Sequence, residues 1–177
     1  ARRTLRRVER TDEANRAVRR LSQSITTKGA GTTLVAALID GSRVWLANVG
    51  DSRAYIVRGA DCEQVTIDHS WAEEEIRAGV INREDAANSK HLNVLTRNIG
   101  AGAAVAADLF GPIELRDRDG LVLCSDGLHS VVTGEDMAAV VRSYPPGDAA
   151  KRLVDMANAA GGPDNSSVIV AVAASEG

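Results

Sequence analysis

The sequence predicts one α+β domain, with strands stacked in sheets and helices outside them. Three observations predict this class: short apolar runs separated by tight turns early in the chain, two helix-like stretches near its end, and a final strand-like run. The 177 residues suffice for one domain with a sizeable core, and there is no internal repeat or low-complexity linker. We therefore expect residues 1–177 to form a single domain.

The composition favours a soluble, cytoplasmic protein. Hydrophobic residues make up 44% of the chain and charged residues 25%, which is typical of globular proteins. No apolar run approaches the roughly 20 residues of a membrane span, and the basic N-terminus lacks the hydrophobic segment of a secretory signal. Cys62 and Cys124 have no metal-type spacing and fit a reduced compartment.

The first predicted element is an amphipathic helix over about residues 5–25, where apolar residues recur at helical spacing. Eight arginines lie in the first twenty residues, a basic balance that raises the question of nucleic-acid binding. Acidic residues are interleaved with them, and no aromatic residue is present to stack on bases. The pattern therefore favours a solvated helix face over a nucleic-acid contact.

Four strand-like runs follow, and short turns containing glycine join most of them. The runs are residues 32–39, 43–49, 52–58 and 62–67. Because they follow one another so closely, we expect them to form an antiparallel meander.

The second half of the chain changes character. Residues 71–93 are charged and interrupted by Gly79, which predicts one or two small helices in an excursion from the sheet. The later elements are separated by polar turns, and they are predicted as strands at 105–115, 121–125 and 166–173 and helices at 133–141 and 149–160.

Three aspartates share one local setting, next to a glycine or proline turn at a strand boundary. They are Asp51 in NVGDSRAY, Asp126 in CSDG and Asp164 in GGPDNSSVIV. Each turn alone is more often structural, and Asp126 alone fits a helix cap. Strand boundaries gather at the ends of stacked sheets, so the three acids can converge. Convergent carboxylates without a His or Cys cluster suit hard cations such as Mg²⁺ or Mn²⁺.

Seven sequence blocks occur in a recognisable order: ANRAV, GTTLVAALI, ANVGDSRAY, TIDHS, NVLTRNIG, LVLCSDGL and GGPDNSSVIV. In this order the chain resembles the metal-dependent serine/threonine protein phosphatases, the PPM or type 2C family, and looks most like the compact bacterial branch. The resemblance covers about residues 14–172. It implies a sandwich of two stacked antiparallel β-sheets flanked by helices (αββα), with metals bound at one end.

The resemblance also implies an activity and its site. The family hydrolyses phosphomonoesters on phosphorylated protein substrates in signalling, using a water activated by a two-metal centre of Mg²⁺ or Mn²⁺. Asp126 and Asp164 match direct ligands of the catalytic metal, and Asp51 matches a position that helps to hold a third metal. Residues 71–93 match the flap that borders the substrate cleft.

The chain departs from the family pattern at two places. It begins without the family's early Arg that grips phosphate and without the Asp-Gly segment whose acid bridges both metals, so we expect an N-terminally incomplete sandwich. Ser130 stands where many relatives have another Asp of the third site. These departures predict impaired catalysis, and the alternative is a catalytically degenerate, phosphatase-like binding module. A sheet edge left unpaired would favour a homodimer.

No catalytic or substrate-binding residue is assigned from the sequence. His129 has the chemistry of a proton donor, but a lone histidine is more often structural. We expect a structural hydrogen bond from His69 and Ser70, and a supporting role near the site for Arg97 and Asn98.

Overall fold

The computed structural model describes residues 11–24, 29–86 and 94–174. The chain divides into two compact units, each built from segments that are distant in sequence. The first contains Ala1–Leu34, Ala47–Asp51 and Ile67–Leu109, and the second contains Val35–Leu46, Ser52–Thr66 and Phe110–Gly177. The single domain predicted over residues 1–177 stays a prediction.

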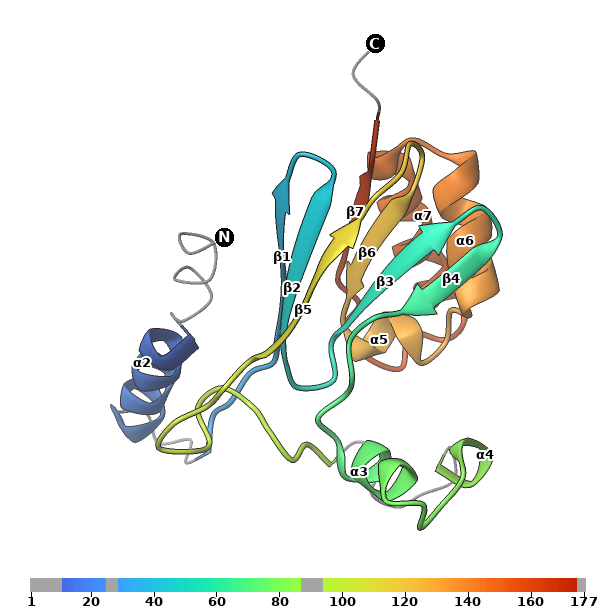
Figure 1. Ribbon diagram of the computed structural model, residues 1–177. Coiled ribbons are helices and arrows are strands. Elements are labelled where there is room, and N and C mark those ends of the chain that lie inside the picture. The colour runs from blue at the N-terminus through green and yellow to red at the C-terminus, as the bar shows by residue number, and fades with distance from the viewer. Residues whose placement is uncertain (1–10, 25–28, 87–93, 175–177) are drawn as a thin grey trace. The chain divides into compact units, whose positions relative to one another are not determined.

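Seven strands in the described residues form two sheets (Figure 1). One sheet has the order β1-β2-β5, and its strands are Leu34–Asp40, Arg43–Val49 and Asp108–Glu114. The other has the order β4-β3-β6-β7, and its strands are Asp61–Gln64, Arg53–Arg58, Gly120–Cys124 and Val168–Val172. The predicted α+β class with two antiparallel sheets flanked by helices is confirmed.

Strand β6 lies inside the four-stranded sheet. It pairs antiparallel with β3, where Arg53 faces Cys124, and with β7, where Cys124 faces Val168. All five residues of β6 are buried. A strand covered on both faces needs apolar side chains at successive positions, which explains the continuous run from Leu121 to Cys124.

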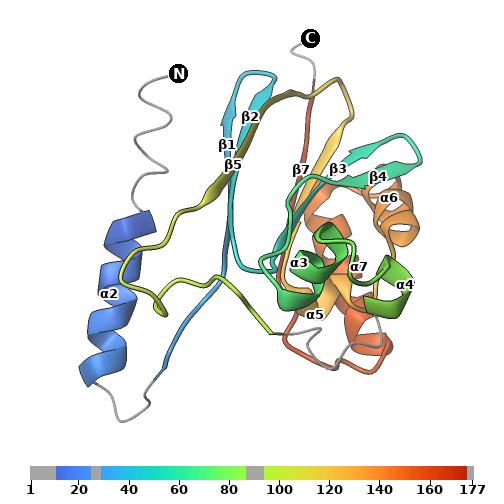
Figure 2. The same ribbon diagram turned by 60° about the horizontal axis from the view of Figure 1, so that its bottom comes forward.

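Alternate residues of this sheet face two different cores. Leu121 and Leu123 lie in a cluster with Val44 and Leu46 of β2, so this core fills the space between the two sheets. Val122 faces the opposite core, with residues of helices α6 (Gly134–Ser143) and α7 (Pro146–Ala159). Figures 1 and 2 show these two helices against the outer face of the four-stranded sheet.

The predicted four-strand meander is wrong. The hairpins β1-β2 and β3-β4 form as expected, with Gly41 and Gly59 at positive φ in their turns. Strands β2 and β3, however, belong to different sheets, and Gly50, at φ +104°, lies in the turn between them. The partner of β2 is β5 and the second partner of β3 is β6. These long-range pairings are not encoded in the local turn.

In the first unit, helix α2 covers Thr11–Ser24, and the rest of the predicted helix, residues 5–10 and 25, lies outside the described residues. Asn15 of this helix is 1% exposed. Its Nδ2 donates to the Gly102 carbonyl (3.1 Å), and its Oδ1 accepts from the Gly100 N–H (2.7 Å). The amide therefore fixes the helix to the loop that precedes β5.

The predicted flap begins with two short helices, α3 at Trp71–Arg77 and α4 at Arg83–Ala86. The Ser70 hydroxyl caps α3 by accepting from the Glu73 N–H (3.3 Å). The rest of the flap, residues 87–93, lies outside the described residues. Across residues 11–24, 29–86 and 94–174, we find no helix with the length and apolar character needed to cross a membrane.

Candidate metal centre

Asp126 follows directly from the end of the central strand. β6 ends at Cys124, Ser125 is the N-cap residue, and Asp126 opens a one-turn helix, α5 (Asp126–His129). This helix was not predicted. It buries Leu128 completely, and Oδ1 of the half-buried Asp126 accepts from the Gly127 N–H (2.9 Å).

Asp164 lies in the loop between α7 and β7. The residue is exposed, and its Oδ1 accepts from the Asn165 N–H (2.7 Å). Both aspartates thus share one arrangement, in which one carboxylate oxygen bonds to the next backbone N–H. This local bond orients each carboxylate relative to its own loop.

The two aspartate-bearing loops are hydrogen-bonded to each other through Ser125. The Ser125 N–H donates to the Ser167 carbonyl (3.0 Å), and the Ser167 N–H donates to the Ser125 Oγ (3.0 Å). The same hydroxyl donates to the Asn165 carbonyl (3.3 Å). Because β6 and β7 are antiparallel, the end of the first strand and the start of the second lie side by side, so Asp126 and Asp164 are held on adjoining loops.

Gly127 allows the close approach of these loops. A Cβ atom there would lie 2.9 Å from the backbone carbon of Asn165, 3.1 Å from the Ser166 Oγ, and closer still to the Asn165 carbonyl oxygen. Any side chain would push the Asp164 loop away. The glycine of CSDG is therefore explained by packing.

The donor chemistry of this pair fits a hard divalent cation, because carboxylate oxygens are the ligands that Mg²⁺ and Mn²⁺ prefer. Over the described part of the chain, no group of three or more His, Cys, Asp or Glu side chains is arranged to hold a metal ion. Asp126 and Asp164 alone would supply only part of a six-oxygen shell. Ser130, the exposed C-cap residue of α5, offers a hydroxyl at the position where the resemblance implies that many relatives have a carboxylate.

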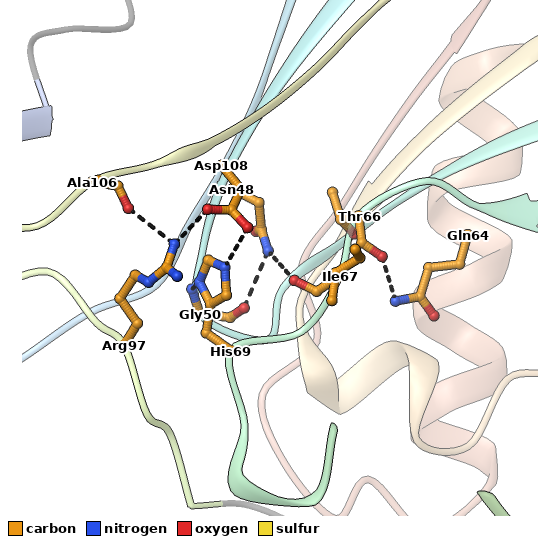
Figure 3. Close-up of polar contacts among 9 residues, drawn as sticks. All are labelled: Asn48, Gly50, Gln64, Thr66, Ile67, His69, Arg97, Ala106 and Asp108. Carbon is orange, nitrogen blue, oxygen red and sulfur yellow. Dashed lines mark hydrogen bonds and ion pairs between the residues drawn. The ribbon is translucent and has the colours of Figure 1, made fainter. Parts of the chain in front are cut away.

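Asp51 belongs to the first unit, whereas Asp126 and Asp164 belong to the second. It is half-buried and follows Gly50, whose backbone is bonded on both sides (Figure 3). The Gly50 N–H donates to His69 Nδ1 (3.0 Å). The Gly50 carbonyl accepts from the His69 N–H (2.9 Å) and from Asn48 Nδ2 (3.1 Å).

A second part of this network lies behind His69. Its Nε2 is 3.2 Å from Asp108 Oδ2, and Arg97 Nη1 is 2.5 Å from Asp108 Oδ1. Burial raises the pKa of Asp108, but the hydrogen bond and charge of Arg97, together with the contact with His69, outweigh it and hold that pKa below its usual value. The structural hydrogen bond expected of His69 is confirmed. Asp108 was missed, because nothing in the sequence around it points to residues so far away along the chain.

Comparison with known proteins finds phosphatases by family model, by sequence and by structure. The family model described as protein phosphatase 2C matches residues 3–99. The serine/threonine phosphatase stp of Listeria welshimeri serovar 6b is 40% identical over 143 residues, which are 80% of this chain and 56% of that relative. The chain therefore spans little more than half the length of this curated relative.

Two solved structures extend the comparison. The serine/threonine phosphatase of S. agalactiae has a TM-score of 0.88 at 35% identity, covering 95% of this chain and 69% of that one. The catalytic domain of the phosphatase PstP in complex with two manganese ions has a TM-score of 0.74 at 30% identity, covering 89% of this chain and 66% of that one. Since the family model spans more than half of the 177 residues, this chain belongs to the protein phosphatase 2C family, the metal-dependent serine/threonine phosphatases also called PPM.

Proposed function

We propose that this chain carries a serine/threonine phosphatase site that hydrolyses phosphomonoesters on phosphorylated proteins, with Asp126 and Asp164 as ligands of a divalent cation, Mg²⁺ or Mn²⁺. The observation that carries the proposal is the hydrogen-bonded contact between the two aspartate loops through Ser125. Membership of the family supports the reaction class, and the manganese-bound PstP domain supports the metal.

The residues of the chain have separate tasks in this proposal. Asp126 and Asp164 bring two negative charges to one end of the β6-β7 pair and so attract a cation. Ser125 and Gly127 keep the two loops at a fixed distance from each other. A divalent cation bound there supplies Lewis-acid chemistry, lowering the pKa of a water ligand and neutralising phosphate charge.

We further propose that Asp51 helps to hold an additional cation, as its match to the GDSR motif implies. Ser130, in the second unit, offers only a neutral hydroxyl, which attracts a cation less strongly than a carboxylate does. Two carboxylates also leave most of the coordination shell at Asp126 and Asp164 to water. We therefore expect the 177-residue chain to bind Mn²⁺ weakly and to turn over slowly.

The test is Mn²⁺-dependent hydrolysis of para-nitrophenyl phosphate by the chain and by Asp126→Asn and Asp164→Asn. Asparagine keeps the shape of each side chain and removes its charge. Asp148→Asn, an exposed carboxylate in the first turn of α7, is the matched control. We expect low activity that both site variants abolish and the control retains. Activity that survives both site variants would refute the assignment.

The alternative is a binding module that recognises phosphorylated ligands without turnover. It is supported by the same incomplete set of carboxylates. Calorimetry with a phosphothreonine peptide and its unphosphorylated form, with and without Mn²⁺, separates the two functions. Phosphate-dependent binding with no release of phosphate over hours favours the module, whereas release of phosphate favours the enzyme.

We also propose a cytoplasmic location for this chain.

We further propose that the chain self-associates through strand β7. This strand lies at the edge of the sheet β4-β3-β6-β7, and its Ile169 is 64% exposed. Edge strands with exposed apolar residues tend to pair with other chains. Sedimentation should show a concentration-dependent dimer that Ile169→Lys weakens. A monomer at every concentration would contradict the dimer.

A further inference from the structure

We infer that His69 is a positioning residue for Asp51. Its Nδ1 accepts a hydrogen bond from the N–H of the preceding residue, Gly50, and Asp108 holds the His69 ring in the Nε2–H tautomer. The inference deepens the proposed function and rests on the metal-binding role proposed for Asp51. It assigns a task to the histidine of TIDHS and to Arg97, and it adds Asp108 to the residues that matter for the site (Figure 3).

Gly50 is restrained on both of its polar backbone groups. Its N–H is bonded to the His69 ring and its carbonyl to the His69 backbone and to Asn48, as given above. Its φ of +104° is a conformation that residues with a side chain rarely adopt, and a Cβ atom there would lie 2.7 Å from the Thr33 Cβ. With both polar groups bonded, the peptide that leads into Asp51 has one orientation.

The contacts of the His69 ring determine which of its nitrogens carries the proton. A nitrogen that accepts a hydrogen bond from an N–H must present its lone pair, so Nδ1 carries no proton. In the neutral ring the proton then resides on Nε2, which lies 3.2 Å from the Asp108 carboxylate, an ion-pair contact whose angle does not meet hydrogen-bond geometry. A carboxylate next to one ring nitrogen is the usual way in which proteins fix a histidine tautomer.

Asp108 is itself held in place by Arg97. Arg97 Nη1 contacts Asp108 Oδ1 at 2.5 Å and also donates to the Ala106 carbonyl (3.2 Å), which places the guanidinium between the two. Arg97, Asp108 and His69 thus form a continuous path to Gly50 within the first unit. His69 is 5% exposed, so water cannot readily replace its ring as a partner for the Gly50 N–H.

The first experiment uses the unmodified, ¹⁵N-labelled chain without metal. A long-range ¹H–¹⁵N spectrum of the histidine rings should show the proton of His69 on Nε2 and none on Nδ1. The Gly50 amide should be protected from hydrogen exchange. A His69 ring with its proton on Nδ1, or a Gly50 amide that exchanges at the unprotected rate, would overturn the inference even if metal binding is intact.

The second experiment compares three variants with Mn²⁺ as the probe, following the paramagnetic broadening of the Asp51 amide signal. His69→Gln places no acceptor at the Nδ1 position, and Asp108→Asn no longer fixes the tautomer. His69→Asn places its Oδ1 near the Nδ1 position and can still accept from Gly50. We expect the first two to weaken the Mn²⁺ titration at Asp51 about tenfold or more and His69→Asn to recover most of the affinity.

Glu84→Gln, an exposed acid of α4 in the same unit, is the control and should leave the titration unchanged. Equal affinity in His69→Gln, His69→Asn and the unmodified chain would overturn the positioning role. If the unmodified chain shows no broadening at Asp51, the metal role of Asp51 fails. The tautomer of His69 and the hydrogen-exchange protection of the Gly50 amide then still test whether His69 positions the Gly50–Asp51 peptide.

Discussion

Replacing Gly127 by alanine should loosen the contact between the two aspartate loops and destabilise the second unit. The added methyl group would lie 2.9 Å from the Asn165 backbone carbon and 3.1 Å from the Ser166 Oγ, inside ordinary contact distance. Because the nearest atoms belong to the backbone, the loop as a whole must move. Overpacking of this kind costs about 1–3 kcal/mol. At an m-value of about 2 kcal/mol/M, a loss of about 2 kcal/mol lowers the urea midpoint by about 1 M.

The assay is urea unfolding followed by far-ultraviolet circular dichroism, with Gly147→Ala as the matched control. Gly147 lies in the first turn of helix α7, and a Cβ atom there meets nothing within 4 Å. Alanine should stabilise this helix by up to about 1 kcal/mol. Gly127→Ala should also weaken the response of the Asp164 loop to Mn²⁺. Equal midpoints for the two alanine variants would refute the packing argument at Gly127.

Three further predictions concern the cores and the ionisable groups. Leu153→Ala, at a fully buried position of α7, should cost about 2–5 kcal/mol in thermal or urea unfolding, and a loss below 1 kcal/mol would contradict the packing described. The pKa of Asp108 is lower in the folded chain than in the unfolded chain, so its ionised form stabilises the fold at pH values above the unfolded pKa. This stability is lost as the pH falls through the folded pKa. The urea midpoint should therefore drop less between pH 6 and about pH 3 in Arg97→Met than in the unmodified chain, and an equal drop would argue against the ion pair. Burial raises the pKa of Cys62 to about 11, so this thiol should react with iodoacetamide at pH 8 far more slowly in the native chain than in urea; equal rates would show that it is not shielded.

Local signals predicted the strands and hairpins well. The run Leu121–Cys124 has the length and composition of a buried strand, and the structure places it at the centre of a sheet. The hairpin at Asp40-Gly41 formed as its turn residues predict. The meander failed because the turn at Gly50 looks like a hairpin turn in sequence, while the choice of sheet depends on β5 and β6, which come much later in the chain.

The placement of the candidate site residues was predictable in part. The sequence pointed to Asp126 and Asp164, and the antiparallel pairing of β6 and β7 explains why their loops adjoin. Helix α5 escaped prediction because four residues are too few to show a helical period. The path from Arg97 to Gly50 also escaped, since it joins side chains whose proximity depends on tertiary structure.

The chain order of β6 and β7 determines when the two strands can pair during synthesis. Asp126 leaves the ribosome well before Asp164, and β7 cannot dock on β6 until helices α6 and α7 have been made. The pair of acids is thus completed by one of the last segments to emerge. A nascent chain stalled within α7 would carry Asp126 without Asp164, and the proposed pair of cation ligands would be completed only when translation resumes.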